Sequence, residues 1–358
     1  MLLHRIGFIA ALASCLPQND LSVYSDGADP QTQPARDEAE ASPPSDPSAT
    51  PGANGGDPSS TPSRPSAPGV GAAPVGAETQ PLGRPDASSA DAGAFGSAAL
   101  TGVSALQLTL GGTQRTFLYY APAALDPSVP VPVLIVAHGL GQSAAQIFEI
   151  TRFDALAERE GFVVLYPEGQ GRIPWNIGAD VCPGARGPVF SARGDDSAFV
   201  DAMLAFVAKD RRIDADHVFV AGFASGGYLA NELACERTDI RAVASHSGGT
   251  HALDACRSAQ KPVLLLHGLS DAAVPARCSD EARERWVEHN GCASDSDERA
   301  VLGGSCSDAR GCPEGGQVSQ CNFEGMGQGW AGGAAQAESF LRYAAASELI
   351  WEFFRTHA

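Results

Sequence analysis

The stretch VFVAGFASGGYLANELACE, residues 218–236, decides the fold. A short apolar run leads into a glycine-rich corner and then into a helical pattern, which predicts a strand, a tight turn and a helix. The corner has the spacing Gly-x-Ser-x-Gly, a pattern that presents a nucleophilic serine at such a turn. However, Ala224 stands at the central position between Gly222 and Gly226, and Ser225 follows one residue later. The stretch therefore predicts the turn, and the alanine raises the question whether the protein has a catalytic nucleophile there.

Strand-like and helix-like runs alternate along residues 104–358, several of the strand-like runs being continuously apolar, as in strands buried on both faces of a parallel sheet. This alternation predicts one α/β domain with a mostly parallel, doubly wound sheet, whose functional residues gather beyond the carboxyl ends of the strands. We expect Asp195 and Asp196 to begin a helix. The expected strands are 115–120, 131–137, 162–167, 218–221, 242–245 and 263–266, and the expected helices are about 143–160, 196–210, 226–236, 277–290 and 337–356.

The region before this domain has a different composition. Residues 1–15 combine a short basic start with an apolar run too short to span a bilayer, which predicts an export signal. The ending Leu-Ala-Ser-Cys resembles the bacterial lipobox and predicts lipidation of Cys15, with plain secretion as the alternative. Residues 16–103 hold 14 of the 25 prolines and few aromatic or β-branched residues, which predicts a disordered linker. We therefore expect an exported protein anchored in a bacterial cell envelope (outer membrane or cell surface) through the lipid on Cys15 alone.

Charge and cysteine content exclude some classes of function. The net charge is −18 and only two residues are lysine, so the chain has no basic surface for nucleic acid. Apart from Cys15, eight cysteines remain, an even number that predicts up to four disulfides in an oxidising compartment without fixing their pairing. A zinc site is the alternative, but no Cys-x-x-Cys pair is present, and we expect neither a metal nor a cofactor.

Further motifs follow other predicted strands. They are His138-Gly139-Leu140-Gly-Gln-Ser, His-Gly-Leu-Ser-Asp271-Ala-Ala-Val-Pro and, near the last helix, Gly-Met-Gly-Gln328-Gly-Trp330-Ala-Gly. Together with WN at 175–176, DDSAF at 195–199 and NGC at 290–292, they resemble the secreted polyhydroxybutyrate depolymerase and feruloyl (acetylxylan) esterase group of α/β-hydrolases. The blocks occur in the order and spacing of that group over residues 104–358. The resemblance implies an α/β-hydrolase fold and carboxylic ester hydrolysis.

The resemblance also implies a role for each matching position. The nucleophile falls on Ala224, the acid of the triad on Asp271, which is retained, and the histidine of Gly-His-x-Trp-Pro-Gly on Gln328. Ala331 stands where the group has proline. An alanine methyl cannot attack a carbonyl and a glutamine amide cannot relay a proton, so two of the three catalytic groups are lost. The backbone N–H groups of Leu140 and Ser225, at the oxyanion-hole positions, do not depend on side-chain identity.

Three functions are compatible with these residues. The first is a catalytically inactive relative of the esterases that binds an ester, polyester or polysaccharide ligand or a protein partner, with His138, Gly139, Trp175 and Trp330 as candidate pocket residues. The second is an active ester hydrolase that uses Ser225 with a relocated base, for which His246 is the candidate. The third is an interaction lipoprotein whose pocket is filled. For both tryptophans, and for His246, ordinary core packing is the alternative role.

Overall fold

The structure is a computed structural model that describes residues 99–171, 174–177, 182, 195–250, 253, 256 and 258–357. All of them belong to one unit of the chain, Arg84–Ala358. The predicted signal segment 1–15 with Cys15 and nearly all of the predicted linker lie outside the described residues. The predicted domain start at residue 104 falls inside the first strand, which begins at Gly102.

The described part of the chain forms one ten-stranded sheet in the order β1-β2-β4-β3-β5-β6-β7-β10-β9-β8. Strands β4, β3, β5, β6, β7 and β10 are parallel, and antiparallel strands flank them on both sides. The strands are β1 Gly102–Leu110, β2 Thr113–Ala121, β3 Val131–Ala137, β4 Val163–Pro167, β5 Ile213–Phe223, β6 Ala242–His246, β7 Val263–Gly268, β8 Ser296–Val301, β9 Gly304–Ala309 and β10 Val318–Phe323.

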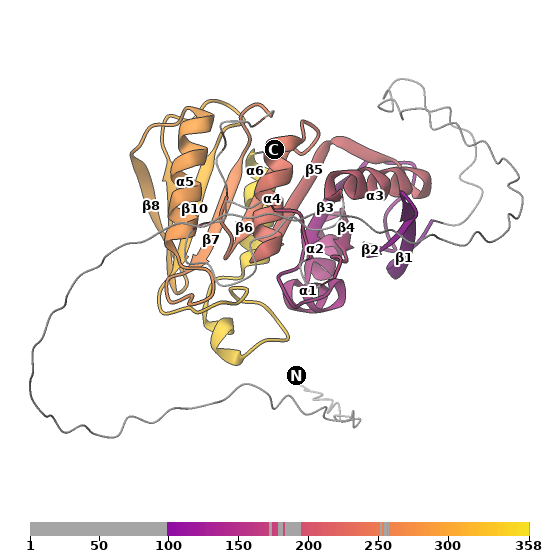
Figure 1. Cartoon of the computed structure of the whole chain (residues 1–358), viewed down its shortest axis with the longest axis horizontal. Coiled ribbons are helices and arrows are strands. Elements are labelled where there is room, and N and C mark those ends of the chain that lie inside the picture. The colour runs from indigo at the N-terminus through magenta and orange to yellow at the C-terminus, as the bar shows by residue number, and fades with distance from the viewer. Residues whose placement is uncertain are drawn as a thin grey trace, which may run out of the picture. The chain divides into compact units, whose positions relative to one another are not determined.

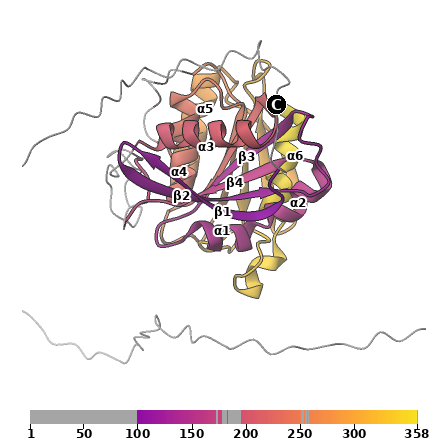
Figure 2. The same ribbon diagram turned by 90° about the vertical axis from the view of Figure 1, so that its right-hand side faces the viewer.

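Helices cover both faces of the sheet, so its central strands are apolar on both sides. Figure 1 shows α3, α4 and α5 in front of the sheet and α6 behind it, and Figure 2 turns the β1–β2 edge toward the viewer. Two separate clusters of buried side chains form, one on each face. The helices are α1 Ala144–Thr151, α2 Phe153–Glu160, α3 Asp196–Asp210, α4 Ser225–Glu236, α5 Arg277–Asn290, the 3-10 helix η1 Glu338–Arg342 and α6 Ala346–His357. No helix among the described residues is long and apolar enough to cross a membrane.

The predicted α/β fold with a mostly parallel sheet is confirmed. All six expected strands are present, and Asp195 caps α3 by accepting a hydrogen bond from the backbone N–H of Ala198 (2.8 Å). The single helix expected over 143–160 is wrong, because Arg152 adopts a left-handed conformation (φ 52°) that separates α1 from α2. Likewise the expected helix 337–356 is divided into η1 and α6.

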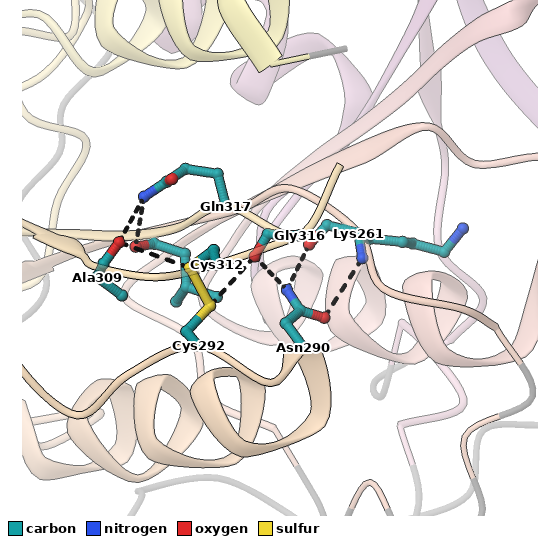
Figure 3. The surroundings of a disulfide bond; sticks show 8 residues. Lys261, Asn290, Cys292, Ala309, Cys312, Gly316 and Gln317 are labelled. Atoms are coloured by element: carbon teal, nitrogen blue, oxygen red, sulfur yellow. Dashed lines mark hydrogen bonds between the residues drawn. A yellow bond between two sulfur atoms is a disulfide. The ribbon is translucent and has the colours of Figure 1, made fainter. Parts of the chain in front are cut away.

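The eight cysteines of the domain form four disulfides, as the even number predicted. The alternative in which these thiolates bind zinc therefore does not apply. Figure 3 shows how one of them, Cys292–Cys312, lies beside the buried amide of Asn290 at the end of α5. Asn290 donates to the backbone oxygens of Lys261 (2.7 Å) and Gly316 (2.9 Å). Through these bonds Asn290, which precedes the β8–β9 hairpin, holds Gly316, which follows it, and Lys261, which lies just before β7. The pairs are Cys182–Cys278, Cys235–Cys256, Cys292–Cys312 and Cys306–Cys321.

Candidate active site

The turn between β5 and α4 has the backbone of a nucleophile elbow. Ala224 has φ 50° and ψ −114°, a conformation that L-residues rarely adopt and that stores about 1–3 kcal/mol of strain. Glycine is required around it. A Cβ atom built on Gly222 would lie 1.9 Å from the carbonyl oxygen of Gly226, and one on Gly226 would lie 2.2 Å from that of Ala137. The strained turn therefore persists although an alanine occupies the place of the serine.

The loop after β3 packs directly on this elbow. A Cβ atom built on Gly139 would lie 3.3 Å from the Cβ of Ala224, so the two turns are in contact. The N–H of Gly139 donates to Oε1 of Gln142 (2.9 Å), which fixes the loop internally. Leu140, the predicted oxyanion-hole position, follows with its side chain 40% exposed. The loop thus has the position, next to the elbow, that an oxyanion-hole loop requires.

His138 is a structural member of this loop. Its Nε2 accepts a hydrogen bond from the N–H of Gly169 (3.0 Å), so the ring proton is on Nδ1, which donates to the carbonyl of Gly139 (2.8 Å). Burial lowers the pKa of His138, so the ring is neutral near pH 7. The Nε1 of Trp175 donates to the carbonyl oxygen of His138 (2.7 Å). His138 and Trp175 therefore hold the loop. The ring nitrogens of His138 and the Nε1 of Trp175 are already engaged in hydrogen bonds and cannot bind a ligand.

The retained acid lies beyond β7. Oδ1 of Asp271 accepts hydrogen bonds from the N–H groups of Ala273 (2.8 Å) and Val274 (2.9 Å), an arrangement that orients the carboxylate. Oδ2 is buried and has no hydrogen-bond partner among the described residues. Nε2 of His267 is 3.8 Å from this oxygen and instead donates to the carbonyl of Val274 (2.8 Å). Oδ2 is therefore the oxygen that a triad histidine would engage.

Gln328 does not take up that role. The loop that carries it touches the acid loop, since the N–H of Ser270 donates to the carbonyl of Met326 (2.8 Å) and Gly268 packs against Gly327. The side chain of Gln328 is nevertheless exposed, and no hydrogen bond joins it to Asp271. The loop brings position 328 to the acid loop, but its side chain does not satisfy Oδ2.

His246 ends β6, and its side chain is completely buried. Its Nε2 accepts from the N–H of Ala331 (3.1 Å), so the proton is on Nδ1, which donates to Oγ of Ser247 (3.1 Å). Burial lowers the pKa of His246 to about 3, and the ring is neutral at physiological pH. Both ring nitrogens are engaged. The structure therefore does not bring His246 and Ser225 together as a base and its nucleophile.

Ser225 and the two tryptophans complete the set of candidate residues. The Oγ of Ser225 is buried and has no hydrogen-bond partner in the described part of the chain. Trp175 and Trp330 are each 1% exposed. Nε1 of Trp330 donates to Oγ of Ser347 (3.0 Å), and the indole stacks on His246 at a centroid distance of 5.0 Å. Both tryptophans thus pack in the interior around the elbow and the loops beside it.

Among the described residues, the hydroxyl of Ser225 has no hydrogen-bond partner, and no histidine lies within hydrogen-bond distance of Oδ2 of Asp271. The sequence did not predict the role of one residue, Gln142, or one contact, between Ala331 and His246. Gln142 had a signal, because it lies in the quoted His-Gly motif at a position where its amide reaches back to Gly139. The bond from Ala331 to His246 joins residues 85 apart, and no local pattern indicates it. Across the residues described, no group of three or more His, Cys, Asp or Glu side chains could hold a metal ion.

The sheet order, the elbow and the acid loop define an α/β-hydrolase fold. Comparison with solved structures supports this assignment: the acetyl xylan esterase from Aspergillus awamori superimposes with a TM-score of 0.54 at 14% identity, over 70% of this chain and 99% of that one. At this identity the likeness concerns the fold alone.

Sequence comparison indicates a family for the domain. Residues 115–260 match the family model "Esterase PHB depolymerase", so this part of the chain is similar to that family. A probable feruloyl esterase C of Aspergillus niger is 33% identical over 46% of this chain and 59% of its own length. Feruloyl esterase C of Emericella nidulans is 28% identical over 67% of this chain and 83% of its own length. The chain thus spans less than two thirds of the first of these relatives.

Proposed function

We propose that this domain is a catalytically inactive member of the esterase family that binds an ester-bearing ligand, or a partner, at the retained elbow. The observation that carries the proposal is the alanine in the strained nucleophile conformation (φ 50°). The elbow conformation serves to expose a serine to a carbonyl. With a methyl group in that place, no acyl-enzyme can form.

Two further observations support the loss of hydrolysis. Gln328 leaves Oδ2 of Asp271 without a partner, so the acid has no base to orient. The relocated pair of Ser225 and His246, on which an active ester hydrolase would depend, lacks a free acceptor, because Nε2 of His246 is engaged by Ala331. In subtilisin, losing the serine or the histidine alone costs about a million-fold in rate.

The ligand class follows from the relatives. Feruloyl and acetylxylan esterases share the fold or the sequence of this domain, so aryl or acetyl esters of plant polysaccharide, or a polyester, are the ligands to test. Four disulfides are typical of an oxidising, extracytoplasmic compartment. We further propose that Cys15 carries a lipid that anchors the protein in the envelope, which incorporation of labelled palmitate into the wild type, but not into Cys15→Ser, tests.

Hydrolysis is tested with the purified, oxidised protein. We expect no turnover of short p-nitrophenyl esters above that of a buffer blank and no labelling by a fluorophosphonate probe. Ser225→Ala is the matched control, since it removes the one remaining hydroxyl at the elbow. Turnover or labelling that this variant abolishes would establish the active hydrolase instead.

Ligand binding is tested separately with polyhydroxybutyrate granules and feruloylated xylan in sedimentation assays. Binding to either supports the proposal. Binding to neither would favour the third function, an interaction lipoprotein whose pocket is filled.

A further inference from the structure

His246 is the buried titratable residue that the proposed function leaves unused. Its ring is nearly parallel to two neighbouring aromatic rings, Trp330 at a centroid distance of 5.0 Å (interplanar angle 25°) and Phe323 at 6.3 Å (13°). Its carbonyl oxygen accepts the N–H of Ala224 (2.9 Å). His246 therefore contacts the elbow through its backbone and, through its side chain, the segment of residues 327–332, named here the 327–332 loop.

The contact with the loop depends on the residue type at position 331. The N–H of Ala331 donates to Nε2 of His246, while the carbonyl of Ala331 accepts the N–H of Ala346 at the start of α6 (2.8 Å). Ala331 is thus fixed at both of its backbone polar groups. A proline at this position has no N–H and could not make the first bond.

The exposed position of the Gln328 side chain requires an explanation. A glutamine amide carries two donors and a long side chain, so it could satisfy a nearby carboxylate oxygen. Yet Gln328 is exposed while Oδ2 of Asp271, at the adjoining acid loop, is buried and unpaired. A buried, unpaired carboxylate oxygen is costly, so the loop must be held against a strong local preference.

We propose that His246 is a positioning residue: by accepting the N–H of Ala331 it holds the 327–332 loop so that side chain 328 points away from Asp271. This inference rests on the proposed function and deepens it. The site lacks two catalytic side chains, and in addition its loop is fixed in a non-catalytic orientation. Restoring the serine and the histidine alone would therefore not restore an efficient triad.

The test compares revertants in steady-state hydrolysis of p-nitrophenyl acetate. We expect the double revertant Ala224→Ser, Gln328→His to remain within a few-fold of the uncatalysed rate. Adding Ala331→Pro removes the donor, and we expect kcat to rise by about 100-fold with little change in KM, as when a general base becomes correctly placed. The kcat of this triple variant should decrease as the pH is lowered from about 7, because the catalytic histidine becomes protonated.

The same bond can be broken from its other end. In the double revertant, His246→Leu removes the acceptor and keeps an apolar side chain of moderate size, and it should raise kcat as Ala331→Pro does. His246→Gln keeps an acceptor and should leave kcat low. Tyr343→Phe is the matched control, since it removes a hydrogen bond to the carbonyl of Glu324 (3.1 Å) and leaves the 327–332 loop untouched.

A direct measurement on the wild type does not depend on any variant folding. With ¹⁵N-labelled histidine and alanine, a coupling across the hydrogen bond between the Ala331 nitrogen and Nε2 of His246 is expected, with a neutral ring from pH 5 to 8. The inference is overturned by absence of this coupling, by a double revertant as active as the triple, or by bond-breaking variants that leave kcat unchanged. Turnover by the wild type, in contrast, would refute the proposed function itself.

Discussion

The variant Gly226→Ala tests whether the elbow packs against the loop after β3. The added Cβ would lie 2.2 Å from the carbonyl oxygen of Ala137 and 2.7 Å from that of His138, about 1 Å or more inside ordinary contact. Both atoms belong to the backbone, so no change of rotamer relieves the overlap and α4 must move away from β3. Overpacking costs about 1–3 kcal/mol and occasionally more, so we expect the upper end, about 3 kcal/mol. For a domain of this size that corresponds to a fall in melting temperature of roughly 6–12 °C.

The assay is thermal unfolding followed by circular dichroism, under oxidising conditions that keep the four disulfides intact. Gly327→Ala is the control, because the nearest atom to its Cβ, the carbonyl oxygen of Ser270, is 3.9 Å away. We expect this control to melt within about 2 °C of the wild type, as surface-like substitutions do. If Gly226→Ala also melts within that range, the elbow does not touch the β3 loop and the proposed oxyanion-hole geometry is wrong.

Three further predictions concern stability. The pKa of His246 is lowered from 6.5 to about 3, so the contribution of the neutral ring to the free energy of unfolding is complete above pH 6.5 and is lost as the pH falls toward 3. Between pH 7 and 4 the free energy of unfolding of the wild type should therefore fall by about 3 kcal/mol more than that of His246→Leu, as measured by urea titration. Replacing Cys182 and Cys278 with serine opens a loop of 96 residues and should lower the free energy of unfolding by roughly 4 kcal/mol, measured in the same way. Asn290→Leu leaves three backbone groups without their side-chain partner and should cost about 3 kcal/mol, whereas a loss below about 1 kcal/mol would show that water replaces the amide.

Six strands of the sheet were predictable because each carries its own apolar signal, whereas the buried strand β10, with the polar sequence VSQCNF, carries none. A continuous apolar run such as Val131–Ala137 has no other place than between two helical layers, and the elbow adds a glycine pattern that admits one backbone path. The family motifs follow strand ends for the same reason. Fold and candidate positions could thus be predicted from local sequence.

The remaining elements lack such local signals. The hairpin of β8 and β9 is polar and largely exposed, so its strands show no apolar run, and pairing with β10 defines them. Arg152 ends α1 in a left-handed conformation that favours glycine or asparagine, and no sequence rule assigns it to arginine. Because tertiary contacts decide both features, a single sequence could not give them.

The candidate site separates into a backbone part, the strained elbow, and a side-chain part, in which Ala224 and Gln328 stand at the predicted nucleophile and histidine positions. The strained conformation of Ala224 is accompanied by close backbone approaches at Gly222 and Gly226, where a Cβ atom would clash, and by a hydrogen bond from its N–H to the carbonyl oxygen of His246. The same residue holds both parts: its backbone carbonyl accepts the N–H of Ala224 at the elbow, and its neutral imidazole accepts the N–H of Ala331 in the loop that carries Gln328. On the proposed function, a backbone held in this way would favour binding, because little conformational entropy remains to be lost when a ligand enters.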